Sequence, residues 1–235
     1  MTLEALTAAT ASMQAAADAY NGKVAEIDDR VNTLIPTVAG VLARTIYLNA
    51  DTGDDANTGE INAPVRTMAG AAALTVHGGY YRIYLQTDLV LEGVSRPKGA
   101  GLLISSDTVG VKRKIRVEGA SVAGSNEAPT IVAPPTVNSI LLADIDIELG
   151  VGAVGTTFRR MFVAGQQTTF DFWNCNFLPL PGADVSLVQS NWLLSISLRV
   201  STYAADMDGL WLFGEAAGTD PATIPRLLVT DLTSL

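Results

Sequence analysis

Three acidic residues, Asp144, Asp146 and Glu148, occupy alternate positions in the segment DIDIE. In an extended strand, alternate side chains project from one face, and neighbouring same-face positions lie about 6.5–7 Å apart. That separation is in the range of the paired carboxylates that hydrolyse glycosidic bonds. The pattern is therefore compatible with glycan cleavage, and also with an acidic outer face that only meets solvent or holds cations.

The surrounding sequence favours the non-catalytic interpretation. A hydrolytic cleft also needs aromatic platforms and one carboxyl group with a raised pKa, and no aromatic residue lies near this strand in the sequence. The strand-rich region is also short for a glycan-cleaving protein. We therefore expect no catalytic residue, no cofactor and no metal site. Asp51, Asp54 and Asp55 could offer oxygen ligands to calcium, but their spacing is not that of an EF-hand, and turn formation explains them better.

The composition limits the partners of the chain. Its 235 residues include 48% hydrophobic and 17% charged residues, and the net charge is −9. Such a surface repels polyanions, so we expect no nucleic-acid partner. No run approaches about 18 apolar residues, so we expect no membrane insertion, and the N-terminus lacks the pattern of a signal peptide. We expect assembly in the cytoplasm of the cell that makes it.

The first part of the chain has the apolar spacing of a coiled coil. Ten positions from residue 3 alternate by steps of three and four, and an average step of 3.5 residues is the period of a left-handed coiled coil. A helix that packs on its own domain is the alternative. Because Pro36 removes a helical hydrogen-bond donor, we expect the helix to end near residue 34 or 35. The large residues of the expected seam are Leu3, Leu6, Met13, Tyr20, Val24, Ile27, Val31 and Leu34.

From residue 45 the apolar period changes to two, which predicts strands that bury one face. Strong strand segments recur every 24–32 residues around Ile83, Ile115, Ile145, Phe172, Ile196 and Leu228, with weaker ones between them. Strands of a sandwich are typically closer together, at 8–12 residues. We predict a mainly β fold, namely a short right-handed parallel β-helix, with an antiparallel β-sandwich as the alternative.

One segment, IYLNADTGDDANTGEINAPVRTMAGAA, resembles the cap of the first coil in phage tail-fibre and tailspike β-helices, which are similar to pectate-lyase-like solenoids. The resemblance covers about 25 residues and departs from the family pattern at Val65, where an aromatic residue is usual. The residues that match the cap pattern are Asp51, Gly53, Asp54, Asp55, Gly59, Pro64 and Thr67.

The resemblance implies a homotrimeric fibre or spike of a virion. It implies contact with other virion proteins through the N-terminal segment and with a glycan or other receptor on the host surface; a polysaccharide-cleaving tailspike is the alternative. Head and tail locations remain equally open. The expected regions are a coiled coil for trimerisation and attachment (1–35), a connector and cap (36–79), a β-helix shaft (80–185) and a C-terminal tip or cap (186–235). Aromatic residues in the last region are candidates for tip contacts, with an ordinary end cap as the alternative: Trp192, Trp211 and Phe213.

Overall fold

The computed structural model describes residues 2–119, 127–133, 137–165, 167–225 and 227–230, and the side chains of 32–41 and 228–230 lie outside this description. The chain divides into two units, Met1–Val41 and Leu42–Leu235, which we call the helical unit and the β unit. Each is described by itself below.

The helical unit consists of one long helix, α1 (Leu3–Leu42, 40 residues). The expected end near residue 34 or 35 was wrong, because the helix continues through Pro36. A proline inside a helix removes one hydrogen bond and costs about 3 kcal/mol. Only one of many hydrogen bonds is lost, and the aliphatic residues that follow carry no turn signal before Gly40. Proline alone therefore does not end this helix.

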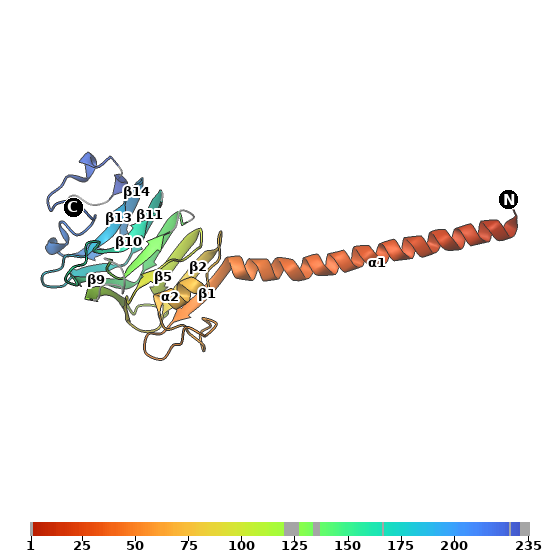
Figure 1. Cartoon of the computed structure of the whole chain (residues 1–235), viewed down its shortest axis with the longest axis horizontal. Helices are drawn as coiled ribbons and strands as arrows, with labels where there is room; N and C mark the ends of the chain where they lie inside the picture. The colour runs from red at the N-terminus through yellow and green to blue at the C-terminus, as the bar shows by residue number, and fades with distance from the viewer. Residues whose placement is uncertain (1, 120–126, 134–136, 166, 226, 231–235) are drawn as a thin grey trace. The chain divides into compact units, whose positions relative to one another are not determined.

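The β unit contains three sheets, and every pairing between its described strands is parallel. Sheet 1 contains, in spatial order, β1 (Ala43–Leu48), β2 (Tyr80–Leu85), β5 (Gly101–Ser106), β8 (Ser139–Ala143), β11 (Thr168–Trp173), β14 (Leu194–Arg199) and β16 (Leu227–Thr230). Sheet 2 contains β3 (Leu89–Val90), β6 (Arg113–Gly119), β9 (Ile145–Gly152), β12 (Asn176–Pro179) and β15 (Thr202–Tyr203). Sheet 3 contains β4 (Val94–Ser95), β7 (Thr130–Ala133), β10 (Arg160–Ala164) and β13 (Ser186–Ser190). Figure 1 shows the strands of sheet 1 lying side by side from β1 to β14.

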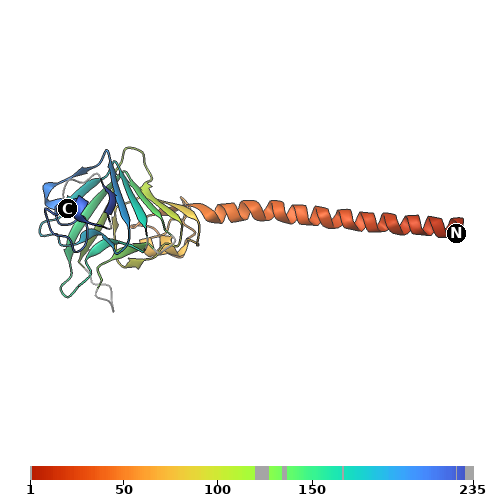
Figure 2. The same ribbon diagram turned by 90° about the horizontal axis from the view of Figure 1, so that it is seen from above.

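The chain visits the sheets in a fixed order. It passes through sheets 1, 2 and 3 as β2-β3-β4, and repeats that order three more times up to β13. Successive passes stack in parallel, which is consistent with the predicted parallel β-helix and not with the antiparallel sandwich (Figures 1 and 2). The strand segments that recur in the sequence lie in two sheets. Ile115 and Ile145 belong to sheet 2, whereas Ile83, Phe172 and Ile196 belong to sheet 1.

The core of the β unit lies inside the stacked passes. Inward residues at paired positions are fully buried, as with Ile83 and Ile104 in sheet 1. Aromatic rings extend the core toward the C-terminal end, where the ring centroids of Phe172 and Phe177 lie 5.0 Å apart and those of Phe177 and Trp211 lie 4.8 Å apart. Each large apolar side chain buried in this way contributes about 1.5–3 kcal/mol.

The corner between sheets 1 and 2 uses a left-handed backbone conformation. Asp144, Asn174 and Val200 occupy equivalent corners of successive passes with φ of 55°, 53° and 55°. Asp and Asn tolerate this region because their short polar side chains bond locally, whereas a β-branched residue is strained there. Val200 is therefore an energetically unfavourable residue at its corner.

A loop and a short helix lie between β1 and the first full pass, which starts at β2. Helix α2 (Met68–Ala73) lies beside β1 (Figure 1). Thr67 caps its N-terminus by accepting a hydrogen bond from the Gly70 amide. The C-terminal part of the unit adds two 3₁₀ turns, η1 (Ala205–Met207) and η2 (Pro221–Thr223).

Candidate functional site

The three candidate catalytic carboxylates do not share one strand face. Asp146 and Glu148 belong to β9, but Asp144 precedes the strand at the left-handed corner. The prediction that all three project from one face was therefore wrong, because the strand begins one residue later than the alternating pattern indicated.

Glu148 is held between two cations. Its side chain is almost fully buried, and its carboxylate pairs with Lys114 at 2.7 Å and with Arg116, both from β6. Burial opposes ionisation of Glu148, but the hydrogen bonds from Lys114 and Arg116 and their charges outweigh it and hold the pKa below its usual value. A general acid in glycoside hydrolysis needs a raised pKa, so Glu148 is unsuited to that role.

The two aspartates are bonded to the next pass of the chain. Asp144 accepts a hydrogen bond of 2.6 Å from the side-chain NH₂ group of Asn174, and Asp146 accepts one of 2.7 Å from the side-chain NH₂ group of Asn176. Thr202 then donates to the Asn176 carbonyl oxygen at 2.6 Å. These bonds link neighbouring passes at the corner and along sheet 2, which indicates a stacking role for both aspartates.

The basic partners of Glu148 were not recognised from the sequence. Within the basic cluster at residues 112–116, Arg113 pairs with Asp107, and Lys114 and Arg116 pair with Glu148. Arg116 and Glu148 are 32 residues apart, which is the spacing at which strong strands recur in the sequence. Opposite charges separated by one such repeat are the signal that could have identified this pairing.

Among the matched cap residues, Asp55 joins the loop to the start of α2. Its carboxylate accepts hydrogen bonds from the amides of Arg66 (2.9 Å) and Thr67 (2.8 Å), and from the Thr67 hydroxyl (2.6 Å). Burial opposes ionisation of Asp55, but these bonds outweigh it and hold its pKa below the usual value. A Cβ at Gly70 would lie 2.1 Å from the Asp55 carboxylate, so a glycine is required there.

The other cap residues shape the same loop. Gly53 is needed because a Cβ would lie 2.4 Å from the Val65 carbonyl oxygen, and Gly59 has a φ of 76°. The carbonyl oxygen of Pro64 accepts from the Asn57 side chain at 2.9 Å. Asp51 and Asp54 are both exposed, and Asp54 accepts one bond from the Ala56 amide. Within the described residues, no three metal-ligating side chains are grouped as a metal site would need.

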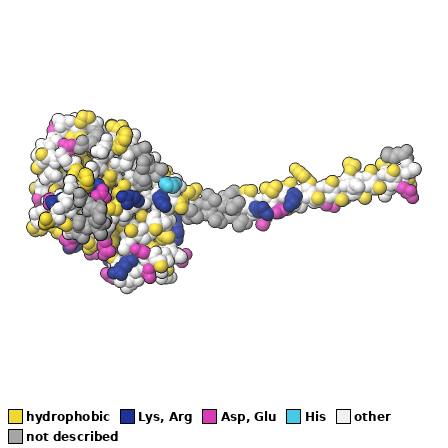
Figure 3. Space-filling model, viewed as in Figure 1, with side chains coloured by type: hydrophobic (Ala, Val, Ile, Leu, Met, Phe, Trp, Pro, Cys, Tyr) yellow, Lys and Arg dark blue, Asp and Glu magenta, His cyan; other side chains and the backbone are white. Residues whose placement is uncertain are grey.

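The residues of the expected seam are exposed on α1. Leu3, Met13 and Tyr20 are each more than 70% exposed, and Leu6, Val24, Ile27 and Val31 are exposed as well. Figure 3 shows hydrophobic side chains along the described part of this helix. The side chain of Leu34 lies outside the described residues. Taken by itself, α1 thus carries an unburied apolar stripe at coiled-coil spacing.

The three tip candidates have different environments. Trp192 is 59% exposed, and Phe213 is partly exposed. Trp211 is only 1% exposed and packs on Phe177. It also contacts Tyr203, with 5.3 Å between the centroids of the two rings. Of the two expected roles, tip contact and end cap, the buried position of Trp211 fits the end cap, because the side chain completes the core. The role of the other two residues stays a prediction.

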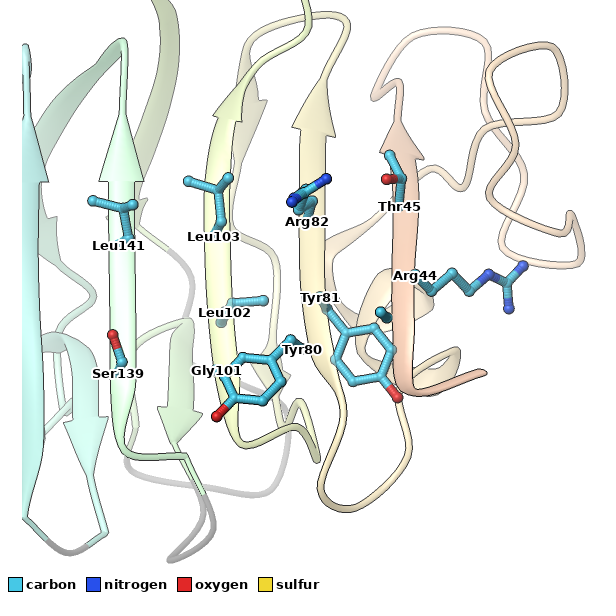
Figure 4. Close-up of a pocket in the computed structure, with 11 residues that line it drawn as sticks. Arg44, Thr45, Tyr80, Tyr81, Arg82, Gly101, Leu102, Leu103, Ser139 and Leu141 are labelled. Atoms are coloured by element: carbon cyan, nitrogen blue, oxygen red, sulfur yellow. The ribbon is translucent and has the colours of Figure 1, made fainter. Parts of the chain in front are cut away.

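A groove that the sequence did not reveal lies on the outer face of sheet 1. It has a volume of about 310 Å³ and spans β1, β2, β5 and β8 (Figure 4). Tyr80, Arg82, Leu103, Ser139 and Leu141 line it at outward positions of their strands. Only the strand register brings these residues together, because they are spread over about 60 positions of the chain.

No protein-family model, curated protein or solved structure matches this chain. None of the helices in the described part of the chain combines the length and the apolarity needed to cross a membrane.

Proposed function

We propose that this chain is a structural spike or fibre protein of a bacteriophage or phage-like particle. In this proposal, α1 forms a homotrimeric coiled coil and joins the other virion proteins, and the β unit is a right-handed parallel β-helix that contacts the host surface. The mature protein is then located in the virion.

The exposed apolar stripe on α1 is the observation that supports the proposal most strongly. Seven large apolar side chains of the seam are exposed, and each contributes about 1.5–3 kcal/mol when it becomes buried. Association costs an estimated 4–15 kcal/mol in lost freedom, which burial of such a stripe in every copy can offset. Copies of the same helix supply a complementary apolar seam, because the spacing repeats in each of them.

The β unit supports the second part of the proposal. Stacked parallel passes form a rigid rod in which each pass contacts mainly its neighbours, and the cap resembles those of phage fibres in its loop and helix residues. A rod of this kind is suited to bearing contacts on its outer faces. The carboxylates near β9 have hydrogen-bond or ion-pair partners within the chain, so host binding without cleavage is the favoured activity.

Immunogold electron microscopy tests this proposal directly. Antibodies raised against the purified chain should label protruding appendages on particles released from the producing cells. Labelling confined to unassembled protein would contradict the virion assignment. Incubation with host surface polysaccharide tests the activity, because release of oligosaccharide that is lost in Asp144→Asn and Glu148→Gln variants would instead support an enzyme.

A further inference from the structure

Outward residues of sheet 1 form two rows across the groove. The strand register places Tyr80 beside Gly101 and Gly101 beside Ser139 in the first row. In the second row the register places Arg82, Leu103 and Leu141 on neighbouring strands. Each row crosses three strands, about 10 Å in all. The two rows thus combine an aromatic ring, a hydroxyl group, two aliphatic side chains and one cation within the size of a small ligand.

The Tyr80 ring forms an exposed flat surface in this groove. Tyr80 is 67% exposed, and a Cβ at Gly101 would come within 2.7 Å of its ring. The absence of a side chain at Gly101 therefore allows the ring to lie over β5 (Figure 4). An exposed ring bordered by Leu103 and Leu141 is suited to the apolar face of a sugar ring, and the Ser139 hydroxyl can exchange hydrogen bonds with sugar hydroxyls.

Two arginines, Arg44 and Arg82, line the groove, and the charge of Arg82 is not neutralised there. Its guanidinium makes no ion pair or side-chain hydrogen bond with any residue that the structure describes, whereas Arg199 on the same sheet pairs with Asp171, and Arg44 donates to the Thr58 carbonyl oxygen. The described residues that line the groove include no carboxylate. The groove is therefore locally cationic on a chain whose net charge is −9.

From this charge complementarity we propose that the groove binds a saccharide unit that carries a carboxylate. The planar guanidinium of Arg82 can hold a carboxylate through two parallel hydrogen bonds, while the sugar ring lies against Tyr80. The volume is at the lower end of the range for small-ligand pockets, which fits one or two sugar rings. The inference rests on the proposed function and specifies the receptor chemistry of the host contact.

A second copy of this chain is a less suitable occupant. Copies arranged around a shared axis with this face inward would bring their Arg82 charges toward one another. None of the lining residues provides a carboxylate to neutralise them, and like charges brought together in an interface are unfavourable. An anionic ligand removes the same problem by supplying the missing charge.

Ligand-observed NMR and calorimetry with sodium glucuronate, using glucose as the neutral control, test the proposal on the full-length protein. We expect glucuronate to bind in the millimolar range that a ligand of its size supports. Glucose should bind about 10-fold or more weakly, because it lacks the charge-assisted hydrogen bonds. An Arg82→Gln variant should weaken glucuronate binding about 10- to 100-fold. Arg96→Gln, the same change at an exposed arginine outside the groove, should leave it unchanged.

Three outcomes would overturn the inference. They are equal binding of glucuronate and glucose, equal effects of Arg82→Gln and Arg96→Gln, and no glucuronate binding by the folded wild-type protein. Sedimentation of the same samples distinguishes failure of the ligand proposal from failure of the proposed function. If Arg82→Gln lowers the mass of the assembly and glucuronate does not bind, the groove lies between copies and the ligand proposal is wrong, while self-association stands.

Discussion

Replacing Asp55 by Asn should destabilise the β unit through the loop that precedes α2. Asn keeps the size of the side chain and one carbonyl oxygen, which can still accept from the Arg66 and Thr67 amides. It loses the negative charge and places an NH₂ group toward the Thr67 hydroxyl, which already accepts a hydrogen bond from the Gly70 amide. The variant therefore weakens two hydrogen bonds and loses the third.

The size of the effect follows from these bonds. Hydrogen bonds to charged groups contribute about 1.5–3 kcal/mol each and neutral ones about 0.5–1.5 kcal/mol, so weakening two bonds and losing the third gives an upper limit of about 6 kcal/mol. Solvent reaches this loop and replaces part of each bond, which reduces the expected loss to about 2 kcal/mol. For a unit of 150–250 residues this lowers the melting temperature by about 4–8 °C.

Thermal unfolding followed by circular dichroism at neutral and acidic pH measures this effect. The pKa of Asp55 is lowered from its usual 3.8 in the folded protein. Its stabilisation is thus present above that value and is lost as the pH falls through the folded pKa. The difference between wild type and Asp55→Asn should shrink on acidification. Asp51→Asn is the control, because it is the same change in the same loop at a carboxylate that accepts no hydrogen bond from the residues that the structure describes. Equal melting temperatures for the two variants would refute this account of the loop.

Three further substitutions test the packing of the β unit. Val200→Asn should raise the melting temperature by about 2–4 °C, because it relieves about 1 kcal/mol of left-handed strain; an unchanged value would contradict the strain. Trp211→Ala should lower the free energy of unfolding by about 3–5 kcal/mol, whereas Trp192→Ala, at an exposed side chain, should change it by less than about 0.5 kcal/mol. Urea unfolding measures both values. A larger loss for Trp192→Ala than for Trp211→Ala would contradict the buried position of Trp211. Glu148 stabilises the fold above its usual pKa of 4.5, and this stabilisation is lost as the pH falls through its lowered folded pKa. Acidification should therefore lower the melting temperature of Glu148→Gln less than that of wild type. The control Glu92→Gln, at an exposed side chain, should behave as wild type.

The sequence allowed prediction of the β architecture because apolar alternation reports directly on which strand face is buried. The segments around Ile83 and Phe172 are strands, as their alternation indicated. The assignment of strands to sheets was less accessible, because it depends on the turns between them. The Asp144 corner is an example, since its left-handed conformation redirects the chain from β8 to β9. Pro36 shows the opposite limitation, because one unfavourable residue was given more weight than the helical residues around it.

The candidate sites depended on contacts across long sequence separations, and sequence reasoning recovered only part of them. Asp55 was recognised through its local loop pattern. The pairing of Glu148 with Arg116 and the gathering of Tyr80 with Leu141 both require the register of stacked passes. Trp211 is of a residue type that is common in contact surfaces, and only its packing against Phe177 identifies it as a core residue.

Sedimentation equilibrium of the full-length protein tests the central claim, that α1 associates with copies of itself. We predict a mass three times the 24.6 kDa of one chain, maintained over a wide concentration range. Paired Val24→Asp and Ile27→Asp substitutions in the seam should reduce the mass to that of one chain. Val154→Asp, at a fully exposed valine of the β unit, should leave it unchanged. A wild-type protein that sediments as a monomer at every concentration would contradict the account.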